Sequence, residues 1–339
     1  MTNESILSVL DTNDSRRADR RDFLRSAGSV SAVVAGASLL AACGGNNSNG
    51  NAAPTPTPTA SGTATPTPTP TGSPLTDADV LNFALNLAYL EAQYFSVVTT
   101  GAGLPANLLT GTGTAGTASG GRQRTFADPV FGQFAREIAA DTRAHVSLLR
   151  GVIGTPVIAQ PAIDLGVTAT SAFSNLARAA QLITTASATY DVYASDEQVM
   201  LGAFVFADVA VTAYRGLAAG VAGATFIDAI AGMVSAKAYH AGLIRAALYR
   251  KGIATPAILD ATEALSKARD DLDGANDLDQ GVKPVNNASN IVPTDGSGLT
   301  FTRLPAQALN ILYLTRASVS AGGFFPAGVN GVLKTSNAV

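Results

Sequence analysis

The sequence predicts an all-α protein built on a four-helix bundle with a long crossover and extra C-terminal helices. Two long stretches, 134–154 and 231–252, lack proline and carry apolar residues every three or four positions, a pattern typical of amphipathic helices. Each contains one of the chain's only two histidines, His145 and His240. The chain therefore resembles two helical hairpins, one weakly repeating the other. The first helix of each expected hairpin lies at 81–95 and 200–214.

Start and stop signals place these helices along the chain. Thr76 precedes two aspartates and predicts an N-cap, and Asp128-Pro129 and Ser195 begin later helices in a similar way. Glycine followed by Thr-Pro ends both histidine-bearing helices. The expected elements are bundle helices at 76–100, from 128, from 195 and at 226–250, a loop at 101–127, a crossover at 152–194, and extra helices at 171–186, 257–271 and 305–317.

The composition supports a large apolar core. Hydrophobic residues make up 47% of the chain and charged residues only 14%, against roughly 25% in an average soluble protein. The net charge of −3 provides no basic surface, so we expect no nucleic-acid partner. The predicted core residues are Leu85, Leu87, Phe134, Phe204, Phe206 and Leu243, with Phe324 and Phe325 covering one end of the bundle.

Residues 1–43 predict a targeting segment rather than part of the fold. Arg20 and Arg21, followed by an apolar stretch, resemble a twin-arginine export signal, which carries folded proteins across a membrane. Leu40-Ala41-Ala42-Cys43 resembles a bacterial lipobox, in which the cysteine becomes lipidated after cleavage. The alternatives are a basic surface run before a core helix, and an ordinary cleavage site beside an unmodified cysteine. We expect a protein of the cell envelope or periplasm, lipid-anchored to either the inner or the outer membrane.

A low-complexity segment follows at residues 44–75, where Pro-Thr repeats predict a semi-extended tether because proline cannot donate to helix or sheet hydrogen bonds. The folded domain is expected at 76–331, followed by a short tail at 332–339. Within the domain, the acidic segment 271–281 suggests calcium, but its glycine is misplaced for an EF-hand loop. We therefore expect a solvated acidic loop there.

Several stretches together resemble a known family. LNFALNLAYLEAQYF, FADVAVTAY, AKAYHAGLIR, DLDQG, ALNILY and GGFFPAGVNG are similar to ferritin-like proteins of bacteria and plants that are related to desiccation-associated proteins. The resemblance covers about residues 76–331. It implies a ferritin-like bundle and, in the family pattern, a dinuclear iron or manganese site. That site takes one Glu from each of two helices and a Glu-x-x-His from each of the other two.

The residues at the implied metal-ligand positions depart from this pattern. The four carboxylate positions correspond to Ala88, Thr142, Ala207 and Lys237, whereas both histidine positions retain His145 and His240. Two neutral imidazoles cannot balance the charge of two divalent ions. The family pattern, applied to these residues, therefore predicts a degenerate metal site.

Nearby carboxylates leave two interpretations open. Glu91, Asp141 and Asp208 could help the histidines hold a single metal ion. Alternatively, the histidines are ordinary core residues and Glu91 pairs with a cation. Lys237 faces the former metal space and is expected to pair with one of these three carboxylates, unless it extends outward to solvent.

Three classes of function remain. The first is a tethered, non-catalytic protein acting in structure, binding or stress protection. The second is a divergent iron or manganese protein with oxidase-like activity, and the third is a small-molecule carrier. We favour the first, with no cofactor and with the membrane as a partner through a lipid anchor; the sequence does not indicate a protein partner. The sequence contains no arrangement typical of nucleophilic catalysis or phosphate binding, so other enzyme classes lack support.

Overall fold

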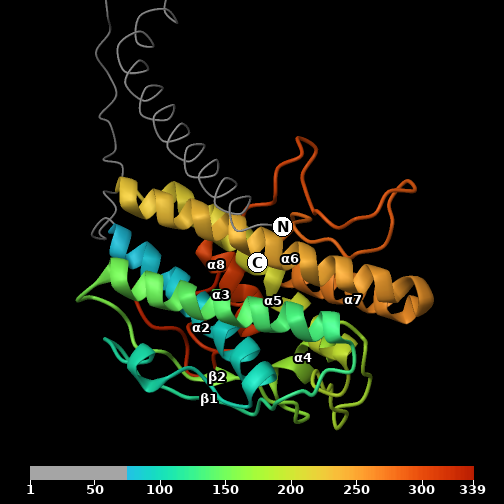
Figure 1. Ribbon diagram of the computed structural model, residues 1–339. Helices are drawn as coiled ribbons and strands as arrows, with labels where there is room; N and C mark the ends of the chain where they lie inside the picture. The colour runs from blue at the N-terminus through green and yellow to red at the C-terminus, as the bar shows by residue number, and fades with distance from the viewer. Residues whose placement is uncertain (1–74) are drawn as a thin grey trace, which may run out of the picture. The chain divides into compact units, whose positions relative to one another are not determined.

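The computed structural model describes residues 75–339. The predicted export signal, Cys43 and all but the last residue of the predicted tether lie outside this range. Helix α2 packs against α3 and helix α5 against α6, so two hairpins form the bundle (Figure 1). The predicted all-α bundle is confirmed. Its four helices are α2 (Asp77–Thr100), α3 (Pro129–Ile153), α5 (Asp196–Leu217) and α6 (Ala224–Ala254).

The predicted caps set the starts of three of these helices. The Thr76 hydroxyl oxygen accepts a hydrogen bond from the Asp79 amide, and the Asp79 carboxylate accepts one from the Thr76 amide. The two bonds form a capping box. Asp128 accepts from the Val130 amide at 2.9 Å and Ser195 accepts from the Gln198 amide. Each cap satisfies amides that the first helical turn leaves without a partner.

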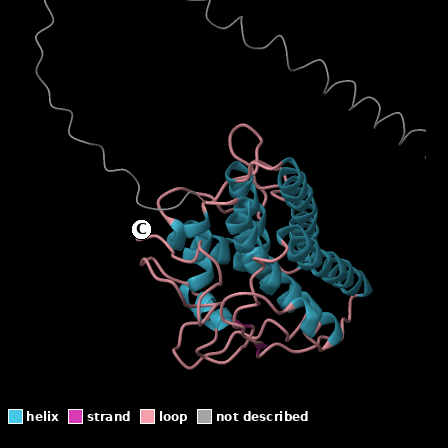
Figure 2. Ribbon diagram, turned by 90° about the vertical axis from the view of Figure 1, so that its left-hand side faces the viewer, coloured by secondary structure: helices cyan, strands magenta, loops and turns pink. Residues whose placement is uncertain are grey.

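Shorter elements connect and cover the hairpins. Figure 2 shows a mainly helical body with small strands among the loops at one end. The predicted helix at 171–186 is shorter than expected because Gln181 takes a left-handed conformation, and Leu314 ends α8 in the same way. The remaining elements are η1 (Ala106–Leu108), β1 (Ala118–Ser119), β2 (Ile163–Asp164), α4 (Ala172–Ala179), η2 (Ala218–Gly220), α7 (Pro256–Asp273) and α8 (Pro305–Tyr313), with β1 and β2 parallel.

The core largely follows the predicted apolar pattern. Leu85, Leu87, Phe204 and Phe206 are buried, and Phe134 is half-buried against them. The expectation for Leu243 was wrong. It lies half-exposed beside a surface groove because its neighbour Ile244, about 100° further around α6, faces the core instead.

The C-terminal segment closes one side of the bundle. Phe324 and Phe325 are fully buried, and the Phe324 ring centroid lies 5.0 Å from that of Phe173. Residues 332–339, expected as a tail, are bonded to the domain. The Asn337 amide donates to Asn310 on α8 at 3.1 Å, and Ser336 is buried.

Helix α5 combines length and apolarity more than any other helix within residues 75–339. The segment Asp196–Gly220 is long and apolar enough to cross a membrane, but 89% of its most apolar window is buried inside the bundle. Its composition is that of a central core helix.

Candidate functional site

Five of the residues singled out from the sequence lie together within the bundle, namely Glu91, Asp141, His145, Lys237 and His240. Asp141 and His145 lie one turn apart on α3, and Lys237 and His240 lie one turn apart on α6, so each pair shares a helix face. The ring centroids of His145 and His240 are 6.0 Å apart. Glu91 approaches from α2 and reaches Lys237.

Lys237 and Glu91 form a buried ion pair. The Lys237 ammonium donates to Glu91 Oε2, and these side chains are only 1% and 7% exposed. The Lys237 nitrogen also lies 4.8 Å from the centroid of the Tyr214 ring on α5, close enough for a cation–π interaction. Lys237 therefore points inward and pairs with one of the three predicted carboxylates.

The histidines occupy unequal environments. His240 Nε2 donates to Asp141 Oδ2 at 2.9 Å, and Asp141 is half-exposed. His145 makes no such contact. Burial, followed by the positive charge of Lys237, lowers the pKa of His145 to about 3. His145 is consequently neutral near pH 7. Within residues 75–339, Nδ1 of both histidines is enclosed and lacks a hydrogen-bond partner.

The other implied ligand positions carry no carboxylate. Ala88 and Ala207 are buried apolar residues, and the Thr142 hydroxyl donates to the Ile138 carbonyl of its own helix at 2.7 Å. Asp208, considered as a helper, accepts from Arg245 at 2.8 Å instead.

Comparison with known families shows to which family the chain belongs. The family model described as "Ferritin-like domain" matches residues 76–250, more than half of the chain. The chain belongs to the ferritin-like family. It is 25% identical over 270 residues to "Ferritin-like catalase Nec2" of Nesocodon mauritianus, an alignment that spans 75% of this chain and 84% of that protein. It is also 25% identical over 274 residues to "Desiccation-related protein PCC13-62" of Craterostigma plantagineum, spanning 76% and 84%. No solved structure matches significantly.

The residues of this ferritin-like protein do not fit a carboxylate-bridged dinuclear centre. Such a centre needs several carboxylates to balance about four positive charges. Here Glu91 is bound to an ammonium, and His145 lies beside that positive charge. Among residues 75–339, no three His, Cys, Asp or Glu side chains are grouped closely enough to hold a metal ion.

A second charged cluster was not predicted from the sequence. Arg269 Nη2 lies 2.5 Å from Asp279 Oδ1, and Arg303 Nε lies 2.5 Å from Asp273 Oδ2. Arg303 also donates to Asp279. One sequence feature could have indicated this cluster: an arginine within an otherwise apolar helical stretch, as at Arg245. The cluster consists of the buried residues Asp208, Arg245, Arg269, Asp273, Asp279 and Arg303.

This cluster corrects the interpretation of the acidic segment 271–281. We expected a solvated loop, but the side chains of Asp273 and Asp279 are fully buried against arginines. Asp271 and Asp277 are exposed as expected, and Asp271 pairs with Lys267. The arginines come from α7 and from residue 303, distant in sequence, so local composition could not reveal the pairing.

Asp270 adds a pH dependence to this region. Burial, followed by the charge of Asp279, raises the pKa of Asp270 to about 7. Because the folded pKa lies above the unfolded value of about 3.9, the ionised carboxylate costs stability as the pH rises from about 4 to 7. Asp270→Asn is therefore expected to raise the free energy of unfolding at pH 8 by about 1–2 kcal/mol, allowing for partial exposure, and to flatten its pH profile. Urea denaturation at pH 5 and pH 8 measures both effects.

Asp271→Asn is the matched control for this prediction. Asp271 is the next residue, is exposed and pairs with Lys267 four positions earlier. Its replacement should change stability by at most about 0.5 kcal/mol, with the same pH profile as the wild type. An equal gain at pH 8 from both substitutions would contradict the role assigned to Asp270.

Proposed function

We propose that this chain is an exported, membrane-tethered ferritin-like protein in which an internal ion pair replaces the dinuclear metal centre. On this proposal the protein is non-catalytic and acts in structure, binding or stress protection at the cell envelope. The observation that carries the proposal is the Lys237 ammonium at the centre of the bundle, bonded to Glu91.

Electrostatics supports the exclusion of metal. A lysine charge about 4 Å from a divalent ion repels it by several kcal/mol at an effective dielectric constant near 20. Lys237 also forms an ion pair with Glu91, the nearby buried carboxylate that a metal would need. The relative named as desiccation-related is consistent with a protective role.

The second candidate is a divergent iron or manganese protein with oxidase-like activity. It is favoured by the contact between His240 and Asp141, by the His145 ring 6.0 Å from that of His240, and by the relative that is named as a catalase. Imidazole and carboxylate are suitable ligands for one iron or manganese ion. This candidate requires a single metal held through the histidines.

Metal content distinguishes the two candidates. We expect the wild-type protein, refolded with iron or manganese and then dialysed, to retain less than one metal per chain by elemental analysis. Restoring glutamate together at Ala88, Thr142, Ala207 and Lys237 should raise metal retention, because it returns four carboxylates. Lys237→Glu alone should not, since too few other ligands surround it.

Each alternative result has a definite meaning. Two tightly bound metals per wild-type chain would overturn the proposal. One metal that is lost in His145→Gln and in His240→Gln would favour the second candidate. Both substitutions keep a polar side chain of similar length, and circular dichroism checks that the bundle remains folded.

The membrane tether is tested separately at Cys43. Cells grown with a fatty-acid analogue should label the wild-type protein, and Cys43→Ser should abolish the label, because the serine hydroxyl cannot form the thioether of a lipoprotein. Replacing Arg20 and Arg21 by lysine should instead retain the protein in the cytoplasm. An unlabelled wild-type protein would contradict the lipid anchor without affecting the proposal for the bundle centre.

A further inference from the structure

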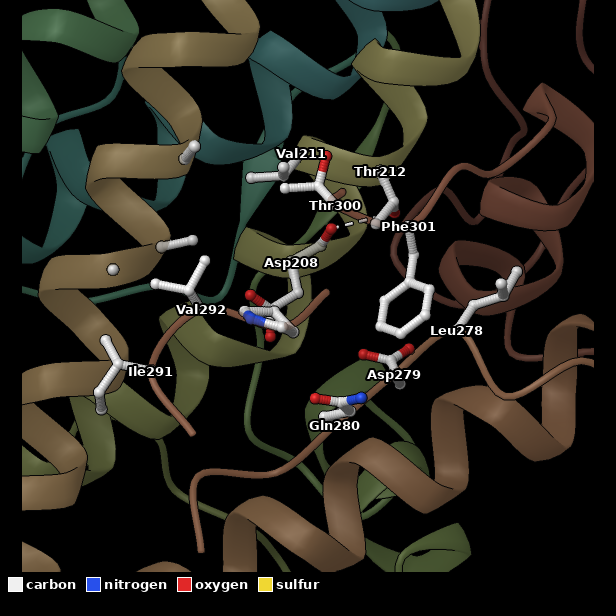
Figure 3. A pocket seen from close by; sticks show the side chains of 14 residues that line it. Asp208, Val211, Thr212, Leu278, Asp279, Gln280, Ile291, Val292, Thr300 and Phe301 are labelled. Carbon is white, nitrogen blue, oxygen red and sulfur yellow. Dashed lines mark hydrogen bonds between the residues drawn. The ribbon is translucent and has the colours of Figure 1, made fainter. Parts of the chain in front are cut away.

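A small pocket lies away from the histidine site, between α5, α6 and the segment 278–301. Its volume is about 50 Å³. Since a water molecule needs about 10–15 Å³ of such space, the pocket holds roughly three or four non-hydrogen atoms. The walls are mainly apolar, with Val211, Ala241 and Phe301 among them. Figure 3 shows the Asp208 side chain between Val292 on one side and Phe301 on the other.

Asp208 supplies a free polar atom in this apolar pocket. Its Oδ2 atom accepts from Arg245, but no donor among residues 75–339 reaches Oδ1. Asp208 lines the pocket and its side chain is 6% exposed, which leaves Oδ1 as the oxygen available to a ligand there. A carboxylate oxygen accepts hydrogen bonds only, which calls for a ligand with a donor group.

The charge around Asp208 is already balanced. Three buried arginines, Arg245, Arg269 and Arg303, face three buried aspartates, Asp208, Asp273 and Asp279. A cationic ligand would add an uncompensated charge to this desolvated cluster, whereas a hydroxyl group would not. The ligand that fits is therefore a neutral donor.

The outer wall of the pocket is held in place by Arg245. Its guanidinium donates to the carbonyls of Ile291 at 2.9 Å and Asn290 at 2.6 Å. Beyond this wall, an open groove of about 510 Å³ runs along α6 toward the exposed Tyr239. Pocket and groove share the residues Ala238, Gly242, Ile291 and Val292. An aliphatic chain longer than the pocket can thus continue into the groove.

We propose that this pocket and groove bind a linear aliphatic alcohol, with its hydroxyl group donating to Asp208 Oδ1 and its chain lying along α6. The site is independent of the proposed function of the bundle centre. The probe is 1-hexanol, titrated into the full-length chain and followed by NMR shifts of α6 amides. We expect saturable binding. Pentyl methyl ether, which has the same number of non-hydrogen atoms but no donor, should bind at least about tenfold more weakly, because it leaves the Asp208 oxygen unpaired.

Gly242→Leu should block the site. A Cβ atom at Gly242 would have no heavy atom within 4 Å, so the new side chain enters the space between pocket and groove without a clash. Leucine is also a better helix former than glycine, so the fold should be retained. We expect at least a tenfold loss of hexanol affinity. Gly232→Leu is the matched control, since Gly232 lies on the same helix, has equally open surroundings and lines neither space. It should bind as the wild type does.

Four results with the alcohol and the ether would overturn the proposal. These are no saturation by 1-hexanol up to its solubility, unchanged affinity in Gly242→Leu, equal loss in Gly232→Leu, and ether binding as tight as that of the alcohol. Protonated hexylamine provides the remaining comparison. Tighter binding of the amine would overturn the neutral ligand class, and weaker binding supports it.

Discussion

Replacing Arg303 by methionine is expected to remove a large part of the protein's stability. Arg303 contacts Asp273 and Asp279 and donates to the Thr212 hydroxyl at 2.9 Å. Burial raises the pKa of both aspartates, and the arginine charges oppose that rise. Removing one partner of a buried ion pair costs about 3–5 kcal/mol, and here two carboxylates lose a partner. A typical domain has only about 5–15 kcal/mol of stability in total.

Urea denaturation followed by circular dichroism measures this loss. Arg316→Met is the control, because Arg316 is exposed and should tolerate the same change within about 0.5 kcal/mol. Arg303→Lys should fall between the two, since it keeps the charge but loses the planar fork that reaches two carboxylates. Equal stability of Arg303→Met and the wild type would show that the cluster does not hold the fold together.

The ion pair at the bundle centre should have the second largest effect. Lys237→Met leaves the Glu91 carboxylate buried without a counter-charge. Glu91→Leu likewise leaves the Lys237 ammonium buried without a counter-charge. Each single change is expected to cost about 3–5 kcal/mol. The double substitution should restore stability to within about 1 kcal/mol of the wild type or exceed it, because well-packed apolar residues replace both charges.

This double-mutant cycle has an internal reference on the surface. The exposed pair of Lys267 and Asp271, four residues apart on α7, should give a coupling energy of at most about 0.5 kcal/mol. If the single substitutions at Lys237 and Glu91 each cost less than about 1 kcal/mol, the buried pair is not the stabilising replacement for a metal centre that we propose.

Local sequence signals predicted most of the fold. The caps at Thr76, Asp128 and Ser195 and the apolar periodicity fixed the long helices, because both depend on residues within a few positions of each other. Helix ends were less predictable where a residue other than glycine took a left-handed conformation, as at Gln181 and Leu314. That choice depends on tertiary contacts and leaves no local signal.

The candidate site was predictable only in part. The inward direction of Lys237 followed from its helix face, but its partner among three carboxylates depended on how the helices pack. Glu91 lies nearly one turn after Ala88, so α2 still supplies a carboxylate to the centre, displaced toward α6. The arginine cluster was missed because it joins residues up to 95 positions apart, from Asp208 to Arg303.

The burial of α5 bears on the export route that we propose for this protein. Asp196–Gly220 has the length and apolarity of a membrane span, and the bundle encloses 89% of its most apolar window. A chain threaded through a membrane before folding would present this segment to lipid, where it could stop and remain as a span. A chain that folds first carries the segment across inside its own core. On the proposed export route, the order of folding and translocation therefore determines whether these residues act as a core helix or as an accidental anchor.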